Sequence, residues 1–550
     1  MSDPVALPFV KSASEPLLKG RKLAISFHVA GESGPLTWHA KALQTSYVSP
    51  PGSGAKGQDE GETAFPFSTA SWFFLDEIDM QAPAGTRVIV CFGDSITDGT
   101  GTTINGDDRW PDVLSRRLHA RLGNRVSVVN AGIGGNQVVG PAEYGPHKPF
   151  PGGPSALSRL DRDVIGLSGV ASVIWLEGVN DFSRNGEATL EAVGRSELNA
   201  VCFLDTDRAR EAARTADVSK PFGGVPIGVK ELDSVEGWPD THASVPLRNQ
   251  VAGHTSIMVQ RLRDLGGGVT FGQTTASEFG GVNLTRTVLH GATLNPWQLD
   301  RTPGGSSGGT AAAVAGGLCT LATAGDGGGS IRIPAGFTGL VGLKSTYGRI
   351  PLGPWSKYGN LTVTIGCLSR SVRDTARWFD VTNGFDARHT LSLPRESGWE
   401  AGLGAHLDEL RGARVAFAPN WGNAVVSPMM WEQLEAAGQE LVAQLGMRRI
   451  DGVDTSVPRM GAAWSLSGNI EVEAQLAEHW PQCAPDLTPE IRFGMEMAVG
   501  KYDSAARAKI ERRRAEVNEA MARIFDPVDG VDFVITASNP DVAFDAEGPL

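Results

Sequence analysis

The chain has 550 residues, of which 41% are hydrophobic and 20% are charged, and its formal net charge is −13. This composition is typical of a soluble globular protein. An acidic chain repels phosphate backbones, so we expect no nucleic-acid partner. The five cysteines are scattered, which predicts neither a disulfide framework nor a zinc site. The start of the chain lacks a signal-peptide pattern and no apolar run reaches about 18 residues, so we expect no membrane partner and a cytoplasmic location.

Residues 1–80 are predicted to be rich in β-strands. The segments "KLAISFHV" and "SWFFLDEIDM" resemble strands, and a polar loop, "SPPGSGAKGQDEGE", separates them.

Residues 81–195 alternate between strands and helices. "TRVIVCFGDS", "NRVSVVNAG" and "ASVIWLEGVND" read as buried strands, and "DDRWPDVLSRRLHARLG" has helical spacing. This alternation predicts a doubly wound parallel sheet, in which ligands bind at the carboxyl ends of the strands. Each of the three strands ends in a polar turn that contains glycine.

The three strand ends resemble the blocks of the SGNH (GDSL-type) esterase family. "FGDSITDG", "NAGIGGNQV" and "EGVND" stand in the family's order. The resemblance implies a flavodoxin-like sheet with Ser95 as nucleophile next to Asp94. The Ser95 and Gly135 amides and the Asn180 side chain would form its oxyanion hole. Residues 1–80 resemble the end of the β-sandwich that precedes this domain in some members.

The catalytic histidine of that family is missing from its usual place. The family ends with an Asp-x-x-His block, but no histidine occurs between Asn180 and His242. His242 follows Asp240 by two residues instead of three, and its segment fits a different pattern. We interpret His119 and His147 as structural or solvated. Without a base, Ser95 is expected to lose about 10²–10⁴-fold or more in rate.

From about residue 196 a second α/β pattern begins. Its predicted strands are "GGVPIGVKELD", "VTFGQTT", "ELRGARVAFAPN" and "DFVITAS". Its predicted helices include "TSIMVQRLRDLGG", the small-residue segment "TAAAVAGGLCTLATAG", and two longer ones beginning at "PMMWEQLEAA" and "DSAARAKIER". Tryptophans 355, 421, 431 and 464 either line a pocket or belong to the core, and aromatic residues at such spacing are more often core.

The stretch "GGSSGG", residues 304–309, has the composition of a flexible linker. Its flanks are small and apolar, however, which does not fit a linker. The longer segment "TPGGSSGGTAAAVAGG", followed by "GDGGGSIRIPAGFTGLVGLKSTYGRI", resembles the amidase signature family. "GGVPIGVKE", "GGVTFGQTTASEFG" and "LNPW" belong to the same pattern. The resemblance covers about 196–550 and implies an α/β domain whose mixed sheet is flanked by helices.

The resemblance also implies the catalytic residues. Ser330 would be the nucleophile, Ser306 a bridging serine on a cis peptide bond, and Lys230 the base. A serine hydroxyl needs a base, and lysine serves as one only when it is neutral, which requires burial. The 24 positions from Ser306 to Ser330 suit one short helix and a return loop.

The glycines before the nucleophile are expected to stabilise the reaction. Amides of Gly327, Gly328 and Gly329 would form the oxyanion hole. Three further residues would support the site, namely Asp326, Arg332 and Ser307. The resemblance implies no metal and no cofactor.

We therefore predict an amidase-type serine hydrolase that cleaves a small-molecule amide, and possible substrates extend to esters or carbamates. Relative to their families both hydrolase parts look incomplete: residues 81–195 lack the closing block, and residues 196–550 lack flanking segments at both ends. Two alternatives stay open. One is an SGNH-type carboxylesterase that uses Ser95, and the other is a truncated fusion without catalytic activity.

Overall fold

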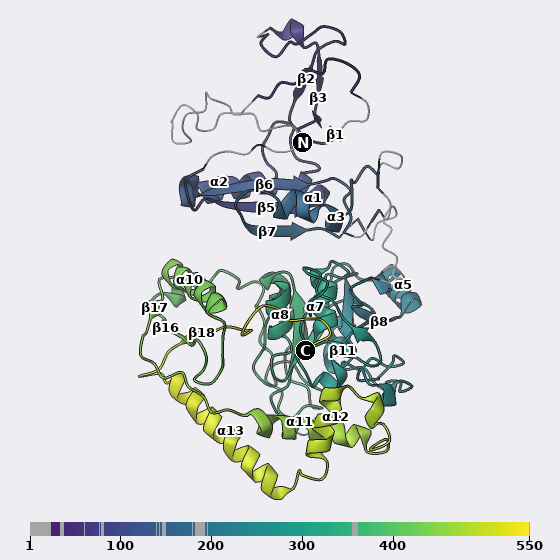
Figure 1. The fold of residues 1–550 in the computed structure, drawn as a ribbon, viewed down its shortest axis with the longest axis vertical. Helices are drawn as coiled ribbons and strands as arrows, with labels where there is room; N and C mark the ends of the chain where they lie inside the picture. The colour runs from purple at the N-terminus through teal and green to yellow at the C-terminus, as the bar shows by residue number, and fades with distance from the viewer. Residues whose placement is uncertain are drawn as a thin grey trace. The chain divides into compact units, whose positions relative to one another are not determined.

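The computed structural model divides the chain into two compact units, Met1–Thr189 and Leu190–Leu550 (Figure 1). Each unit is described by itself. Among the described residues, no helix is both long and apolar enough to cross a membrane. The structure describes residues 24–33, 38–59, 61–75, 78, 82–138, 140–141, 144–145, 150–178, 180–181, 193–194, 196–354 and 361–548.

The first unit is built on a three-stranded parallel sheet. Its strand order is β6–β5–β7, with β5 at Arg87–Gly93, β6 at Val126–Gly132 and β7 at Val170–Leu176. Helices α1 (Ser95–Asp98) and α2 (Trp110–Leu122) connect β5 to β6, and α3 (Ala156–Leu160) follows β6. The first strand lies between the next two, which is the order of doubly wound sheets and confirms the predicted fold class.

The segment before this sheet forms two small antiparallel pairs. Strand β1 (Trp38–His39) pairs with β4 (Trp72–Phe73), and β2 (Ser46–Val48) pairs with β3 (Phe67–Thr69). The strand predicted at "KLAISFHV" is wrong for its described part, residues 24–29, which is irregular. Its apolar side chains Ile25, Phe27 and Val29 are exposed and lack the sheet face that would bury them.

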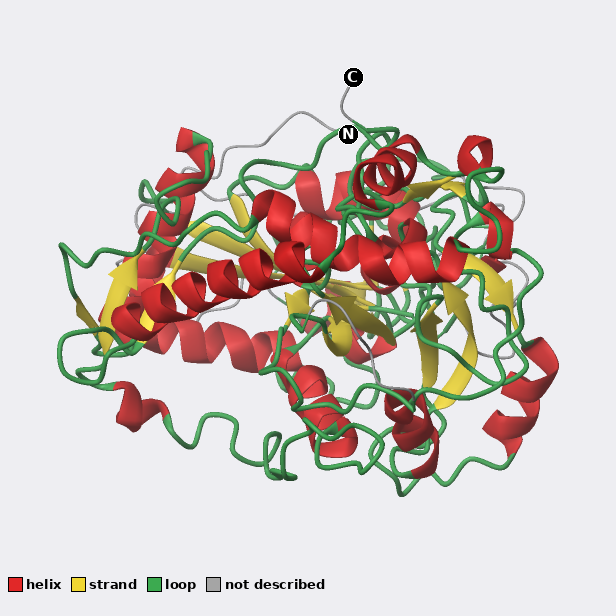
Figure 2. Ribbon diagram, turned by 90° about the horizontal axis from the view of Figure 1, so that it is seen from below, coloured by secondary structure: helices red, strands yellow, loops and turns green. Residues whose placement is uncertain are grey.

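The second unit contains a six-stranded mixed sheet flanked by helices (Figures 1 and 2). Strand β9 pairs in parallel with both β10 and β13, and the outer pairs are antiparallel. In spatial order the strands are β14 (Val341–Gly342), β15 (Thr364–Ser369), β13 (Leu321–Asp326), β9 (Pro226–Lys230), β10 (Val269–Thr274) and β8 (Val201–Leu204).

Helices cover both faces of this sheet and form two cores. Helices α5 (Thr206–Arg214) and α7 (Gly308–Ala315) share one buried cluster with β8 and β10, and α8 (Arg332–Thr338) packs with α7. Helices α6 (Ile257–Asp264) and α9 (Val372–Thr382) bury their apolar stripes on the other face with β9, β13 and β15. Burial on both faces explains why β10 and β15 contain no exposed residue.

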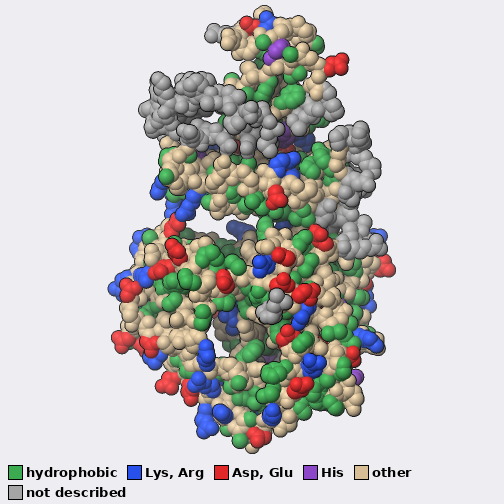
Figure 3. All heavy atoms as spheres, in the orientation of Figure 1, with side chains coloured by type: hydrophobic (Ala, Val, Ile, Leu, Met, Phe, Trp, Pro, Cys, Tyr) green, Lys and Arg blue, Asp and Glu red, His purple; other side chains and the backbone are tan. Residues whose placement is uncertain are grey.

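The C-terminal part adds a small sheet and four long helices. The sheet has the order β17–β16–β18, at Arg448–Arg449, Arg414–Phe417 and Phe533–Ile535. The helices are α10 (Pro428–Gln444), α11 (Gly461–Leu476), α12 (Pro489–Ala498) and α13 (Ser504–Ile524). Figure 3 shows acidic and basic side chains interspersed over one face of this unit.

One predicted element of this unit is wrong. The segment "TAAAVAGGLCTLATAG" was expected to be a single helix, but α7 ends at Ala315 and residues Leu321–Asp326 form strand β13. Gly317 has φ +77, a conformation that ends helices. Pairing with β9 and β15 then overrides the helical propensity of the alanines.

Candidate active site

The "GGSSGG" loop is buried at the start of α7. Ser306 and Ser307 are at most 3% exposed, and the peptide bond between Gly305 and Ser306 is cis. A Cβ at Gly305 would lie 2.5 Å from the Leu284 nitrogen, and one at Gly309 would lie 2.4 Å from the Thr275 nitrogen. These glycines therefore let the backbone approach neighbouring segments closely, which a flexible linker does not require.

Lys230 lies at the carboxyl end of the central strand β9 and contacts both serines. Its Nζ donates hydrogen bonds to Ser306 Oγ at 2.7 Å and to Ser307 Oγ at 2.9 Å. Its backbone N–H donates to Thr323 Oγ1 at 2.7 Å, and that hydroxyl donates to Asp233 Oδ2 at 2.6 Å. Strand pairing and this hydroxyl bridge together fix the amine beneath the loop.

Burial dominates the electrostatics of Lys230. The side chain is 2% exposed, and desolvation lowers its pKa from 10.5 to about 8. The carboxylates of Asp233, Asp326 and Glu231 act in the opposite direction and keep the pKa from falling further. A substantial share of the amine is therefore neutral slightly above neutral pH, as a proton acceptor must be.

Ser330 lies in the turn between β13 and α8, which Asp326 organises. The buried Asp326 carboxylate accepts hydrogen bonds from the Gly329 and Ile331 amides at 2.8 and 3.2 Å, and Arg332 binds it through two nitrogens at 2.9 Å. Burial alone would raise the pKa of Asp326, but the hydrogen bonds and charge of Arg332 outweigh it and lower that pKa. The turn is thus held by an ionised carboxylate.

The three predicted oxyanion glycines differ in their surroundings. The Gly329 amide is already engaged by Asp326, so in this conformation it is not directed at a substrate oxygen. The Gly327 carbonyl accepts a hydrogen bond from Thr362 Oγ1 at 2.8 Å, which orients the peptide plane that follows it. Gly328 is exposed.

Ser307 connects the lysine to this turn. Its Oγ lies 3.3 Å from the Gly325 carbonyl oxygen and 3.4 Å from the Gly325 nitrogen, on β13. Gly325 directly precedes Asp326, whose amide contacts hold the turn on both sides of Ser330. Lys230, the two serines and the Ser330 turn therefore lie together at the carboxyl ends of the central strands β9 and β13. Ser330 itself is half-buried.

A group next to Lys230 was missed by sequence analysis. Glu231 is 2% exposed, accepts a hydrogen bond from the Ala276 amide at 2.7 Å and pairs with His290 Nε2 at 2.9 Å. Cys202 Sγ lies close to both, and among the described residues these three side chains form one group whose geometry could hold a metal ion. The side-chain atoms that would bind a metal already take part in hydrogen bonds, and burial raises the pKa of the Cys202 thiol. We therefore interpret the group as structural.

In the first unit, the residues predicted for the esterase site follow the carboxyl ends of the three strands. Ser95 begins α1, and the buried Asp94 caps this helix by accepting from the Ile96 amide at 2.9 Å. Gly135, with φ +87, follows β6, and the Asn180 side chain donates to the Asn136 carbonyl at 2.9 Å.

The structure shows one histidine at this edge that the sequence blocks did not indicate. His39 Nε2 lies 2.7 Å from Asp98 Oδ1, and Asp98 also accepts the Gly134 amide at 2.9 Å. Asp98 is one helical turn after Ser95 on α1. His119 is exposed on α2 and contacts Ser115, in line with its interpretation as solvated.

Two further histidines were considered for this role. His242 belongs to the second unit and stacks on Phe279. His147, like Trp355 among the tryptophans considered above, lies outside the described residues.

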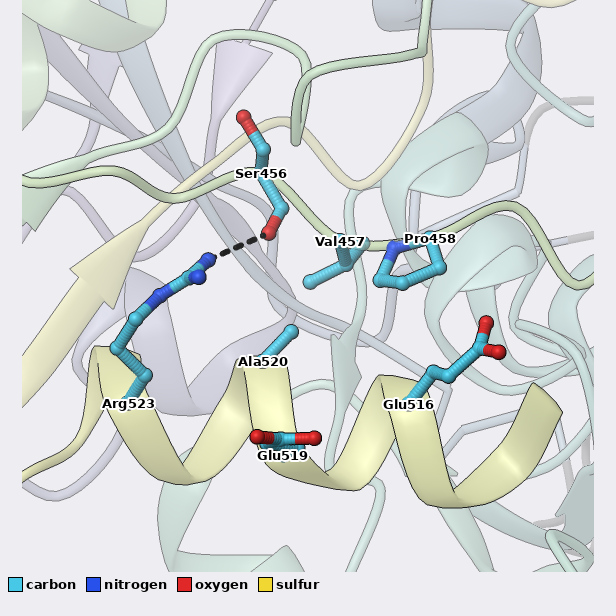
Figure 4. Close-up of a pocket in the computed structure, with 7 residues that line it drawn as sticks. All are labelled: Ser456, Val457, Pro458, Glu516, Glu519, Ala520 and Arg523. Atoms are coloured by element: carbon cyan, nitrogen blue, oxygen red, sulfur yellow. Dashed lines mark hydrogen bonds between the residues drawn. The ribbon is translucent and has the colours of Figure 1, made fainter. Parts of the chain in front are cut away.

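One hollow of the described surface is lined by none of these residues. It measures about 610 Å³ and lies between α13 and a preceding loop, where Arg523 donates to the Ser456 carbonyl at 3.4 Å (Figure 4). A smaller cavity of about 350 Å³ has Ile333 and Phe337 of α8 in its wall, one turn beyond Ser330.

Models of two different protein families match this chain. A model of the GDSL-like lipase/acylhydrolase family matches residues 91–266, and a model of the amidase family matches residues 187–549. The two matches overlap, and the structure assigns most of the overlap to the second unit, because β8, β9 and α6 lie in or against its six-stranded sheet.

Curated relatives include the A subunit of glutamyl-tRNA(Gln) amidotransferase from several organisms. The one from Deinococcus deserti is 32% identical over 392 residues, covering 65% of this chain and 77% of that protein. Its counterpart from Methanosarcina acetivorans is 37% identical over 229 residues, so the match spans 41% of this chain and about half, 47%, of the relative.

Solved structures of amide-cleaving enzymes are also similar to this chain. A bacterial aryl acylamidase of the amidase signature family is 26% identical with a TM-score of 0.59, over 66% of this chain and 77% of that one. A 6-aminohexanoate cyclic dimer hydrolase is 27% identical with a TM-score of 0.53, over 62% and 75%. Because the amidase model matches more than half of the chain, and does so over the unit that contains the buried lysine and the serine loop, this chain belongs to the amidase family.

Proposed function

We propose that the second unit hydrolyses carboxamides of small molecules through an acyl-enzyme at Ser330. The observation that carries the proposal is the 2.7 Å contact between the buried Lys230 amine and Ser306 Oγ, at a sheet edge shared with the Ser330 turn. Membership of the amidase family and the likeness to an aryl acylamidase support a reaction at a carbon–nitrogen bond.

The proposed proton path runs from Ser330 through Ser306 to Lys230. Neutral Lys230 accepts the Ser306 proton while Ser306 accepts the Ser330 proton, and Ser330 Oγ bonds to the amide carbon. The protonated lysine then returns the proton through Ser306 to the leaving amine as the carbon–nitrogen bond breaks. A water molecule attacks the ester in the same way and releases the acid.

The oxyanion of both steps would be bound by backbone amides. We keep Gly327 and Gly328 in this role, whereas the Gly329 amide serves the Asp326 carboxylate. Amides held in place before the reaction contribute more than mobile ones, because no reorganisation accompanies charge development. The Asp326–Arg332 pair, with Ser307 against β13, supplies that rigidity.

The test is Ser330→Ala, assayed against a chromogenic anilide. We expect kcat to fall about 10⁴-fold or more, since nucleophile and base act as a unit. Ser95→Ala is the matched control, because it removes a serine from the strand end of the other unit. Undiminished anilide turnover by Ser330→Ala would rule the proposal out.

A second candidate function is ester hydrolysis by the first unit through Ser95. It is favoured by the contact between His39 and Asp98, one helical turn from Ser95, which offers an imidazole where the sequence blocks supply none. Ser95→Ala and His39→Gln should then both abolish hydrolysis of short-chain nitrophenyl esters while the anilide is still cleaved. Loss of ester hydrolysis in Ser330→Ala alone would assign that activity to the second unit instead.

A further inference from the structure

Helix α11 places an aromatic side chain directly on the turn that carries the proposed oxyanion hole. A Cβ built on Gly328 would lie 2.8 Å from Trp464 Cζ2 and 3.0 Å from its Cη2. The benzo edge of the indole is therefore in van der Waals contact with the Gly328 backbone. Gly328 is not among the glycines with a positive φ, so the indole, rather than backbone conformation, is what excludes a larger residue there.

Trp464 is held in this position from the C-terminal helices. It lies in the first turn of α11, and Ser467 Oγ of the next turn donates to its carbonyl at 3.2 Å. Further along α11, Val472 and Leu476 are buried in a cluster with α12. The indole itself is only half-buried, so part of its surface stays open beside an exposed glycine.

We propose that Trp464 forms the wall of an acyl-group subsite that selects amides of flat, apolar acids, such as aryl carboxamides, over amides of small aliphatic acids. The inference rests on the function proposed above. A carbonyl oxygen bound to the Gly328 amide is about 3 Å from that nitrogen, and the acyl substituent begins one carbon further on. A substituent of ring size therefore reaches the indole, whereas a methyl group makes little contact with it.

Contact with the indole favours this substrate class for two reasons. Burying a ring against a ring removes a large apolar area from water, and aromatic pairs gain additional energy from edge-to-face or offset geometry. The hydrogen-bearing edge of an indole is also the positive part of its quadrupole, which suits a position beside a developing oxyanion.

The experiment compares nitroanilides that share one leaving group and differ in the acyl group, benzoyl against acetyl. We expect the unmodified protein to favour benzoyl in kcat/KM, and Trp464→Ala to lower the benzoyl-to-acetyl ratio about tenfold or more, mainly through KM. Trp464→Phe should keep the ratio within about threefold of the original. Trp431→Ala, which removes a half-buried tryptophan packed on Phe417, is the matched control and should leave the ratio unchanged.

A double variant tests the contact itself. Gly328→Ala should lower turnover of both anilides because its methyl group collides with the indole, and adding Trp464→Ala should restore acetanilide turnover at least tenfold relative to Gly328→Ala. An unchanged acyl ratio in a folded Trp464→Ala, or an equal change in Trp464→Phe, overturns the inference while the proposed function stands. If the unmodified protein cleaves neither anilide, the proposed function fails and the inference fails with it.

Discussion

Replacing Lys230 by methionine should inactivate the enzyme and at the same time stabilise it. The buried amine has its pKa lowered from 10.5 to about 8, chiefly by desolvation. At about 1.4 kcal/mol per tenfold change in proton affinity, this difference means that the charged amine costs the folded state about 3 kcal/mol. Methionine has a similar length and needs no charge, so Lys230→Met should raise the free energy of unfolding by about that amount at pH 7.

The pH dependence of this gain follows from the direction of the pKa change. Between pH 8 and 10.5 the unfolded chain binds a proton that the folded chain does not, so the stability of the unmodified protein rises with pH in this range. The advantage of Lys230→Met should therefore be full below pH 8 and vanish towards pH 10.5. Denaturant unfolding monitored on the second unit, at pH 7 and at the alkaline end of this range, measures it. A variant that is equally or less stable at pH 7 would refute the reasoning.

Three further predictions concern the same unit. The kcat/KM for the anilide should rise about tenfold per pH unit up to about pH 8 and then level off, because only neutral Lys230 accepts a proton. A flat profile of kcat/KM from pH 6 to 9 would contradict this prediction. Glu231→Gln removes one of the carboxylates that oppose deprotonation of Lys230, so the acid limb of that profile should move to lower pH, with roughly three- to tenfold faster turnover at pH 6.5. Gly309→Ala should lower the thermal midpoint of the second unit by several degrees, because its Cβ would lie 2.4 Å from the Thr275 nitrogen. The control is Gly253→Ala, which has open space around its Cβ and should leave the thermal midpoint nearly unchanged.

Much of the fold could be predicted from local patterns. Strands β5, β6, β7, β9 and β10 are short apolar runs that end at glycine or polar turns, and α2 shows clear helical spacing. Strand β13 could not be predicted in this way. Its residues "LATAGD" favour a helix or a loop locally, and they form a strand because β9 and β15 on either side supply the hydrogen-bonding partners.

The candidate site was predictable where a motif carried it. The family resemblance named Lys230 and Ser306 from an ordered set of segments, and Asp326 and Arg332 were predicted as supporting residues. The structure brings these segments together at the carboxyl ends of the central strands and pairs Asp326 with Arg332. No local pattern pointed to His290 beside Glu231, to His39 beside Asp98, or to Trp464 on the turn. Each of these contacts joins segments far apart in the chain, and a single sequence contains no record of such distances.

The central claim is that Ser330 is the nucleophile, activated through Ser306 by Lys230. An active-site-directed fluorophosphonate, mapped on the intact chain by mass spectrometry, tests it most directly. The account predicts a label on Ser330 that is lost in Lys230→Met and forms faster at pH 8 than at pH 6. A label found on Ser95 alone, or one on Ser330 that forms equally fast without Lys230, would contradict the account.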